Sequence, residues 1–317
     1  MRARVGAGYN RRMIAADIVA AIRARLARAL APAAGNYTPL RVADEPVGWL
    51  DAARAARLAQ FSDVFDVRPG GIRFVAAIAS AAARTDALHR VATALAAAGA
   101  LSAWRNELYA VAPAFGAAPS FLLERAAARF FGIRTWAVHV NGLVETAAGT
   151  RMWIARRSPD KAIDPGLLDN LVGGGVPAGA DVRGTAVKEA WEEAGIPAPL
   201  AQRAAATGAV HICRAQPDGL QRETIFVHDL SLPADFRPEG QDGEVAGFRL
   251  LPLDDAARLV AQADGPDVVT ADASLVIVDC LMRRGLFAPD LPDYLALEAL
   301  RHPPLLPGPG PRMPPTG

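Results

Sequence analysis

The segment GGGVPAGADVRGTAVKEAWEEAGI, residues 173–196, places a triple glycine ahead of a helix-forming stretch that carries three glutamates. In a helix with about 100° per residue, Glu189, Glu192 and Glu193 fall within an arc of about 100° and project as neighbours. Like charges at this spacing destabilise a helix by roughly a few tenths of a kcal/mol per pair. The fold must therefore leave this face in solvent or bring a cation to it.

The boundaries of this helix are marked by residues that suit helix ends. Asp181 is a good N-cap and Gly195 a good C-terminal stop, which predicts a helix from about residue 182 to residue 194. The side chains expected to pack against a sheet lie opposite the glutamates: Val187, Ala190, Trp191 and Ala194.

The glutamate face has two interpretations. It is either a solvated surface on which charges cluster by chance, or a site for a hard cation such as Mg²⁺ or Mn²⁺, which prefers carboxylate oxygens. The glycines at 173–175, with Gly179 after them, favour the second interpretation. We expect them to form a sharply turning loop that offers a carbonyl to a metal or N–H groups to a phosphate. Their spacing is that of neither a P-loop nor GxGxxG.

Length and charge limit the classes of function. A chain of 317 residues predicts one large domain or two smaller ones. Its net charge of +1 gives no general attraction to nucleic acid or to an acidic membrane. The longest apolar run, at 74–83, is about half of what spans a bilayer. Cys213 and Cys280 lack CxxC spacing, so we expect buried free thiols in a reducing environment. The Arg-rich start resembles an amphipathic helix more than a signal peptide and only weakly excludes an organellar transit peptide. Together with the cysteines, this favours a cytoplasmic protein.

The first part of the chain reads as mostly helical. Ala, Leu and Arg recur at helical spacing, with short strand-like runs between them. Helices are predicted at 14–30, 50–58, 86–98 and 121–131, the last ending at Gly132, and strands at 72–75 and 108–111.

The pattern changes at Ile133, where TWAVHVNGLV alternates like a half-buried strand and Met152–Ala155 is its expected hairpin partner. Further strands are predicted at GAVHICRA, ETIFVHDLSL and VAGFRLLPL, and helices at 253–263 and 273–284. The Pro-rich end, HPPLLPGPGPRMPPTG, predicts a flexible tail. The expected domains are therefore 1–132 and 133–287, followed by a tail at 288–317.

The opening segment resembles the Nudix box, G-x5-E-x7-R-E-U-x-E-E-x-G-U, in which U is aliphatic. Gly174 takes the first glycine, and Glu189, Glu192 and Glu193 take the glutamates that hold metal in that family. Two positions differ: Ala180 stands where the family has a glutamate, and Lys188 where it has arginine. Lysine keeps the charge but loses the fork-like guanidinium that can orient a carboxylate.

A second resemblance lies outside the box. SAWRNELYAV, LLERAAARFFGIRTWAVHVNGLV and MWIARRSPDKAIDPGLLDNLVGGG are similar to Nudix proteins that carry a DUF4743-type N-terminal extension, some of them fused to thiamine pyrophosphokinase. This resemblance implies an α+β fold, with a Nudix α/β/α sandwich and mixed sheet after a smaller, mostly helical α/β domain. It further implies metal-dependent hydrolysis of thiamine diphosphate or of its damaged oxythiamine and oxothiamine analogues, with release of phosphate.

The resemblance also implies roles for single residues. Glu189, Glu192 and Glu193 are expected to bind Mg²⁺ or Mn²⁺ together with a carbonyl of Gly173 or Gly174, and either Glu189 or Glu244 to act as the base. The expected contacts of a small diphosphate substrate are Arg156, Arg157, Lys161, His139 and Gly173.

Each of these residues also has a plainer interpretation. The Arg156–Lys161 segment can be a solvated cationic loop, Glu244 an exposed turn carboxylate, and His139 a hydrogen-bonded core histidine that shares a strand face with Asn141. Arg105 and its neighbours Trp104 and Glu107 are expected to form a contact between the domains. Hydrolysis of a nucleoside or sugar diphosphate, and a non-catalytic ligand sensor, remain the alternatives. Either a monomer or a homodimer is compatible with the sequence.

Overall fold

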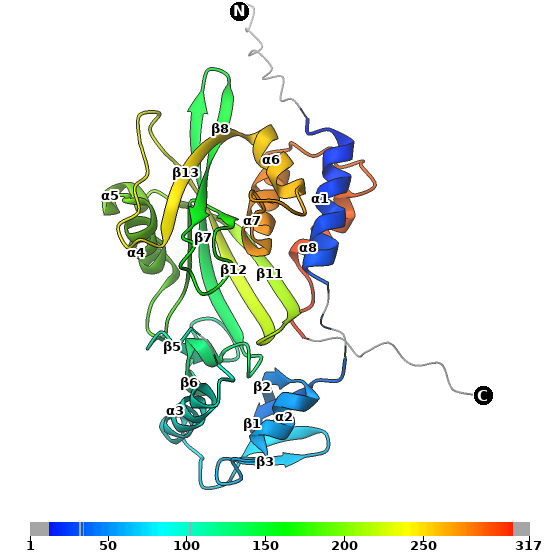
Figure 1. The fold of residues 1–317 in the computed structure, drawn as a ribbon, viewed down its shortest axis with the longest axis vertical. Coiled ribbons are helices and arrows are strands. Elements are labelled where there is room, and N and C mark those ends of the chain that lie inside the picture. The colour runs from blue at the N-terminus through cyan, green and yellow to red at the C-terminus, as the bar shows by residue number, and fades with distance from the viewer. Residues whose placement is uncertain (1–12, 32, 34, 102, 307–317) are drawn as a thin grey trace, which may run out of the picture.

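The computed structural model describes residues 13–31, 33, 35–101 and 103–306. The chain forms two parts, a large sheet flanked by helices and a smaller N-terminal unit at one end of that sheet (Figure 1). The predicted change of structure at Ile133 corresponds to the start of β7 (Arg134–Thr146), one of the two longest strands of the large sheet. The α+β fold with a mixed sheet is therefore confirmed.

The large sheet has seven strands in the order β11-β12-β7-β8-β13, with β10 paired to β7 and β9 to β8. Strands β12 and β7 run parallel, and the other pairs are antiparallel. The strand bounds are β7 (Arg134–Thr146), β8 (Gly149–Arg157), β9 (Leu168–Asp169), β10 (Val172–Gly175), β11 (Ala205–Gln216), β12 (Gly219–Ser231) and β13 (Val245–Pro252).

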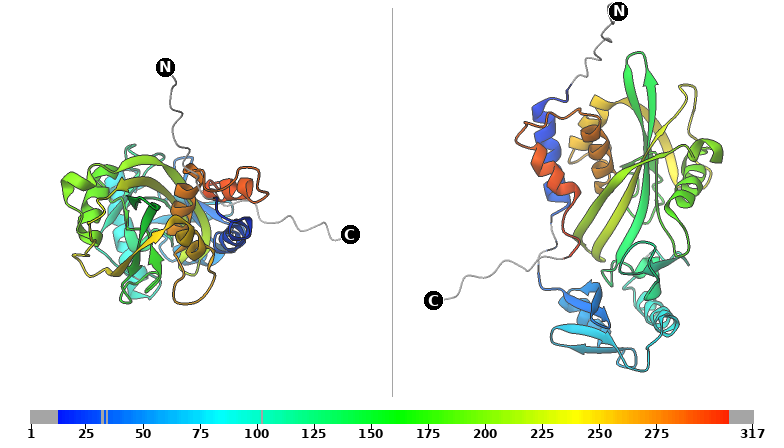
Figure 2. Two further views of the ribbon diagram at one scale, coloured as in Figure 1. Left: turned by 90° about the horizontal axis from the view of Figure 1, so that it is seen from above. Right: turned by 180° about the vertical axis from the view of Figure 1, so that it is seen from behind.

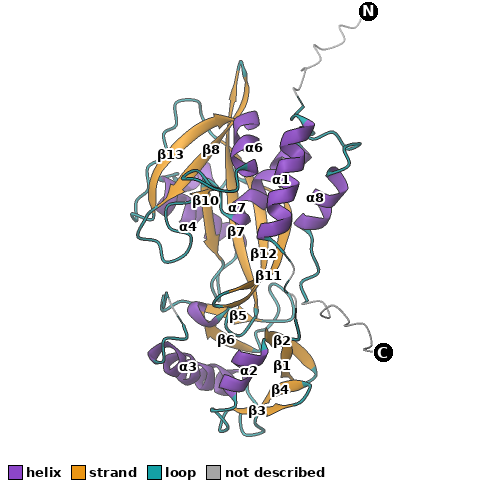
Figure 3. Cartoon of the chain, turned by 45° about the vertical axis from the view of Figure 1, so that its right-hand side comes forward, coloured by secondary structure: helices purple, strands orange, loops and turns teal. Residues whose placement is uncertain are grey.

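Helices cover both faces of this sheet (Figure 3). One apolar core joins Val138 and Val140 of β7 to Ala186 and Ala190 on the α4 side. A second core joins the opposite face to the other helices. The helices are α4 (Val182–Ala194) and α5 (Ala198–Ala201) on one side, with α1 (Ala16–Ala29), α6 (Leu253–Ala261), α7 (Ala271–Arg283) and α8 (Tyr294–Arg301) on the other.

Helix α1 packs with the large sheet rather than with the N-terminal unit that follows it in the chain. Its apolar stripe, which includes Ile22 and Leu26, joins the core of α6 and α7. Arg25 is buried among these helices and donates to the Val260 carbonyl at 2.9 Å and to the Ser274 hydroxyl at 2.8 Å. Helix α1 lies within the stretch predicted as the first domain, and it packs into the core of the large sheet.

Helix α8 corrects the expectation of a flexible tail from residue 288 (Figure 2 shows α8 beside α1). Leu297 is fully buried, and Arg301 donates to Asp279 of α7 at 2.6 Å. The prolines that suggested a tail lie beyond this helix, and residues 307–317 lie outside the described part of the chain.

The N-terminal unit contains helices and strands. It has a four-stranded sheet of order β2-β1-β4-β3 and a hairpin of β5 and β6. Its elements are β1 (Thr38–Val42), β2 (Glu45–Leu50), α2 (Ala52–Leu58), β3 (Phe65–Arg68), β4 (Gly71–Phe74), α3 (Ala81–Ala97), β5 (Leu108–Val111) and β6 (Phe121–Glu124).

Residues 121–131 do not form the predicted α-helix. Phe121–Glu124 forms strand β6, and a single turn of 3-10 helix follows at Arg125–Ala127. The pairing of β6 with β5 satisfies its backbone groups and buries Phe121 and Leu123, which overrides the helical propensity of the Ala and Arg residues after it.

Helix α4 begins and ends where the sequence predicted. The Asp181 side chain accepts from the Gly184 N–H at 2.7 Å, and Gly195 ends the helix with φ of 62°. The packing face is different from the expectation in one respect, because Trp191 is 52% exposed while Ala190 and Ala194 are buried. Glu193, in contrast, turns toward the sheet and is only 6% exposed.

Cys213 and Cys280 are free and buried, as predicted. No helix within the described ranges is long and apolar enough to cross a membrane.

Candidate active site at the junction of the two parts

A cavity of about 540 Å³ lies where the N-terminal unit meets the large sheet. Its floor is one face of β7, on which Thr135, Ala137 and His139 alternate with the buried Trp136 and Val138, and Ile133 continues it just before the strand. Glutamates of α4 line one part of the cavity, and side chains of β5, β12 and the 3-10 turn line the other part. The floor extends over six residue steps of a strand, about 20 Å.

The triple glycine forms strand β10 rather than the expected loop. Gly173, Gly174 and Gly175 pair with His139, Val138 and Ala137 of β7. None of the three has a positive φ, so a turn does not explain them.

Each of these glycines instead leaves room for one functional side chain. A Cβ on Gly173 would lie 2.9 Å from the His139 ring, and one on Gly174 would lie 2.5 Å from the Glu189 carboxyl carbon. A Cβ on Gly175 would lie 2.0 Å from the Tyr109 hydroxyl. The glycines thus let three side chains from three elements approach one short strand.

The glutamates of α4 differ in their surroundings. Glu193 accepts from the Gly173 N–H at 2.8 Å, and burial raises its pKa to about 8 although Lys161 opposes that shift. Burial also raises the pKa of Glu189 despite the nearby Lys188. Glu192 lies at the cavity surface. Two of the three carboxylates therefore lose hydration without gaining enough positive charge to compensate.

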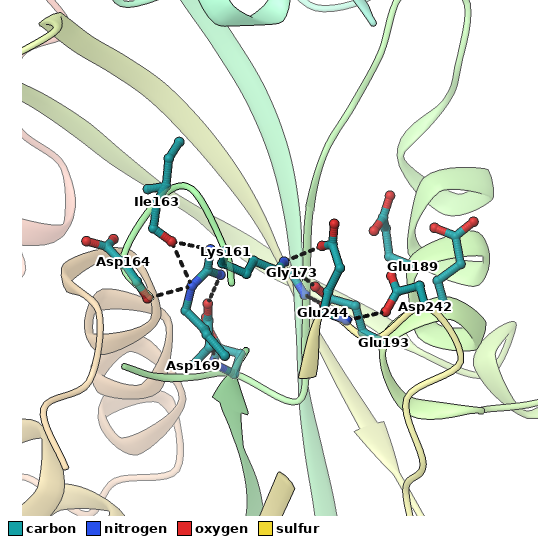
Figure 4. A network of polar contacts seen from close by, with 12 residues as sticks. Lys161, Ile163, Asp164, Asp169, Gly173, Glu189, Glu193, Asp242 and Glu244 are labelled. Atoms are coloured by element: carbon teal, nitrogen blue, oxygen red, sulfur yellow. Dashed lines mark hydrogen bonds and ion pairs between the residues drawn. The ribbon is translucent and has the colours of Figure 1, made fainter. Parts of the chain in front are cut away.

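Two lysines provide the positive charge that is present. Lys188 lies 3.2 Å from Glu189 and 2.5 Å from Glu192. Lys161 lies between Glu193, at 3.4 Å, and Glu244, with which it forms a close ion pair (Figure 4). As the side chains stand, no three His, Cys, Asp or Glu residues in the described ranges are grouped to hold an ion.

The donor set nevertheless fits a hard divalent cation. Glu189, Glu192 and Glu193 of α4 and the carbonyl of Gly173 are oxygen donors on two adjoining elements, and the desolvated carboxylates of α4 lack compensating charge. Gly173 donates its N–H to Glu193 rather than to β7, so its carbonyl also points away from that strand, whereas the carbonyl of Gly174, the other expected ligand, faces Val138 of β7. A cation here would take over the role of the two lysine ammonium groups.

The three basic residues before β9 have separate positions. Arg156 is turned away from the cavity, where it donates to the carbonyls of Gly166 and Pro266 at 2.8 Å and pairs with Asp267. Arg157 lines the cavity, but its guanidinium holds Asp169 at 2.7 Å and the carbonyl of Ile163 at 2.9 Å. Only Lys161 reaches the glutamates.

Glu244 joins the two parts of the chain. One of its oxygens pairs with Lys161, and the other lies 3.5 Å from Arg105 of the N-terminal unit. Burial alone would raise the pKa of Glu244. The positive charges of Lys161 and Arg105 outweigh this effect, and the pKa lies below its usual range. The expected contact between the domains at Arg105 is therefore found at the cavity itself.

Several lining residues had no signal in the sequence. They come from β5, the 3-10 turn and β12, which are distant in the chain from the glutamate helix: Tyr109, Arg125, Gln221 and Glu223. Arg125 pairs with Glu107 at 2.7 Å and lies over the Tyr109 ring at 5.7 Å. Only the close approach of Tyr109 to Gly175 links these residues to a recognisable sequence feature.

Replacing Lys161 by methionine is expected to lower the free energy of unfolding by about 1–3 kcal/mol, because buried Glu193 loses its cation. Thermal melts in EDTA would measure the change, and added Mg²⁺ should reduce it by supplying another cation. A variant as stable as the native protein in EDTA would contradict the counter-ion role of Lys161.

Two family models cover most of the chain: a domain of unknown function, DUF4743, matches residues 20–135 and a NUDIX domain matches residues 135–271. Nudix hydrolase 24, chloroplastic, of Arabidopsis thaliana is 39% identical over 265 residues, which are 83% of this chain and 72% of the relative. Nudix hydrolase 20, chloroplastic, of the same plant is 38% identical with equal coverage.

Two solved structures are similar to part of this chain. The NUDIX domain of Shewanella oneidensis NrtR, solved with ADP ribose, has a TM-score of 0.39 and 13% identity, covering 49% of this chain and 90% of that one. DR0079 of Deinococcus radiodurans has a TM-score of 0.36 and 22% identity, covering 46% and 82%. The NUDIX family match and the two plant relatives show that the chain belongs to the Nudix hydrolases, enzymes that act on diphosphate linkages.

Proposed function

We propose that this protein hydrolyses thiamine diphosphate or its damaged oxythiamine and oxothiamine analogues, with release of phosphate and with Mg²⁺ or Mn²⁺ as cofactor. The observation that carries the proposal is that one cavity joins the α4 glutamates to a second region lined by the N-terminal unit. A diphosphate at the first region would place its organic group in the second.

The second region suits a cationic, nitrogen-rich group such as that of thiamine. Glu107, Glu223 and Asp272 line it, with Tyr109 as an aromatic wall. Arg125 already pairs with Glu107 and lies over the Tyr109 ring, and Asp272 pairs with Arg214. Glu223 is therefore the carboxylate proposed to attract a cationic group here.

In this proposal Glu189, Glu192, Glu193 and the Gly173 carbonyl, which points away from β7, hold the cation. When bound, the ion would neutralise the diphosphate and make attacking water more acidic. Glu189 is the proposed proton acceptor, because burial raises its pKa, whereas Lys161 and Arg105 lower the pKa of Glu244. Lys161 would exchange its carboxylate partners for a phosphate oxygen, while Arg157 holds the loop that carries Lys161.

The second candidate is a non-catalytic ligand sensor. It is favoured by Lys188, which pairs with two of the glutamates, and by Ala180, which stands in place of a family glutamate. A sensor would bind a diphosphate without converting it.

Incubation of the purified protein with a panel of diphosphates distinguishes these functions. With Mg²⁺ we expect phosphate release from thiamine or oxythiamine diphosphate, and EDTA should abolish it reversibly. The same assay would include ADP-ribose and NADH. Rapid cleavage of ADP-ribose without turnover of any thiamine compound would refute the thiamine assignment, and binding without turnover would indicate the sensor.

A further inference from the structure

A chain of buried polar side chains leads from the cavity floor to helix α7, which packs on the same face of the sheet. His139 Nδ1 lies 2.8 Å from Asn170 Oδ1, and Asn170 Nδ2 donates to Asn141 Oδ1 at 3.0 Å. Asn141 Nδ2 donates to Asp229 Oδ1 at 2.9 Å, and Asp229 accepts from Arg283 of α7 at 2.9 and 3.1 Å. His139, Asn141 and Asn170 are buried, so each polar atom needs its partner.

The direction of these hydrogen bonds follows from the last acceptor. A carboxylate paired with arginine can only accept, so Asn141 must present its NH₂ group to Asp229. Its oxygen then faces Asn170, which must present its own NH₂ group. The Asn170 oxygen is therefore left for His139, whose Nδ1 must carry a proton.

The other ring nitrogen is the free end of this chain. His139 Nε2 has no hydrogen-bond partner in the described part of the protein, and the ring lines the cavity, lying flat over Gly173. With Nδ1 protonated, neutral imidazole offers a lone pair at Nε2.

Further acceptors lie on the same face of β7. Beyond Ala137, whose small side chain leaves room above the floor, the Thr135 hydroxyl lies 3.1 Å from a carboxylate oxygen of Glu223. The two positions are four residue steps apart, about 13 Å along the strand. The floor therefore has an acceptor at each end, His139 Nε2 and the Glu223 carboxylate, with the small side chain of Ala137 between them.

We propose that His139 is a specificity-determining residue, held as its Nδ1–H tautomer by Asn170, Asn141 and Asp229 so that Nε2 accepts a hydrogen bond from an N–H donor on the organic group of the substrate. This inference rests on the proposed diphosphate hydrolysis. His139 Nε2 would select diphosphates whose organic group carries an amino group or a ring N–H over those whose organic group is purely carbon-based. The reason is that burying an acceptor without a donor is costly.

Nitrogen NMR of ¹⁵N-histidine-labelled protein tests the tautomer without any substrate. We expect His139, assigned by the loss of its signal in His139→Gln, to carry its proton on Nδ1. Asn170→Asp keeps an acceptor for Nδ1 and should preserve this state, whereas Asn170→Ala should allow the Nε2–H form. Native protein in the Nε2–H form would overturn the proposal. So would Asn170→Ala with unchanged tautomer signals.

Binding measurements by calorimetry test the role of Nε2. In metal-free buffer, His139→Ala should weaken the binding of thiamine diphosphate about tenfold, because one hydrogen bond is lost. The binding of inorganic pyrophosphate should not change. Mn²⁺ affinity should also stay unchanged. His89→Ala, exposed on α3, is the matched control. Equal losses for pyrophosphate or Mn²⁺ would assign His139 to the diphosphate or the metal and overturn the proposal, as would unchanged thiamine diphosphate binding.

ADP, which carries an amino group and ring nitrogens, separates this inference from the thiamine assignment. If native protein binds ADP but not thiamine diphosphate, and His139→Ala weakens ADP about tenfold, the substrate proposal fails and the acceptor role stands. If His139→Ala binds every organic diphosphate as the native protein does, the acceptor role fails whatever the substrate.

Discussion

Glu192→Gln is expected to lower kcat about 10³-fold or more while leaving the fold intact. The side chain lies at the cavity surface, so glutamine can occupy the same space. It removes one charged oxygen from the proposed cation site, which is worth several kcal/mol of transition-state stabilisation. Steady-state kinetics with saturating Mg²⁺ would measure the loss, and circular dichroism would establish that the helix remains.

Glu239→Gln is the matched control for this variant. Glu239 is exposed, lies outside the cavity lining, and undergoes the same chemical change. It should retain native activity. If Glu192→Gln kept activity within about tenfold of the control, Glu192 would not hold a catalytic metal ion.

Gly174→Ala should have the second-largest effect, a fall in kcat of about 10²-fold. The added Cβ would lie 2.5 Å from the carboxyl carbon of Glu189, so this carboxylate must move away from β10. A displacement of about 1 Å at a reacting group is enough for a loss of this size. The thermal midpoint should fall as well, because overpacking of this kind costs about 1–3 kcal/mol.

Gly247→Ala separates this steric effect from a general effect of losing a glycine in a strand. A Cβ on Gly247, in β13, meets nothing within 4 Å. The variant should therefore be as active as native protein. Native kinetics for Gly174→Ala would mean that the position of Glu189 against β10 is unimportant for turnover.

The local features of the site could be predicted from the sequence because they depend on neighbouring residues. Asp181 and Gly195 mark the ends of α4 through caps that need only local geometry. Alternation in β7 likewise placed His139 and Asn141 on one face, and both lie in the same polar chain.

The remaining features depend on contacts between distant parts of the chain. Trp191 fell on the expected packing side of α4, yet it is exposed because the small Ala190 and Ala194 make the close contact. Phe121–Glu124 forms a strand because β5 lies beside it. The role of the triple glycine followed only from the three side chains that approach it, and one of these, Tyr109, comes from the other part of the chain.

The second half of the cavity could not have been found from spacing either. Tyr109, Arg125 and Glu223 belong to three elements that only the tertiary fold brings together. The box at 173–196 therefore predicted the glutamates that line one half of the cavity, whereas the half lined by the N-terminal unit required the structure.

Anomalous diffraction from crystals grown with Mn²⁺ tests the central claim most directly. We expect a peak bounded by Glu189, Glu192, Glu193 and the Gly173 carbonyl, with the ammonium groups of Lys161 and Lys188 moved away from these carboxylates. Crystals with saturating Mn²⁺ and no peak at α4, or with both lysines still paired to the glutamates, would contradict the assignment of this helix as the metal site.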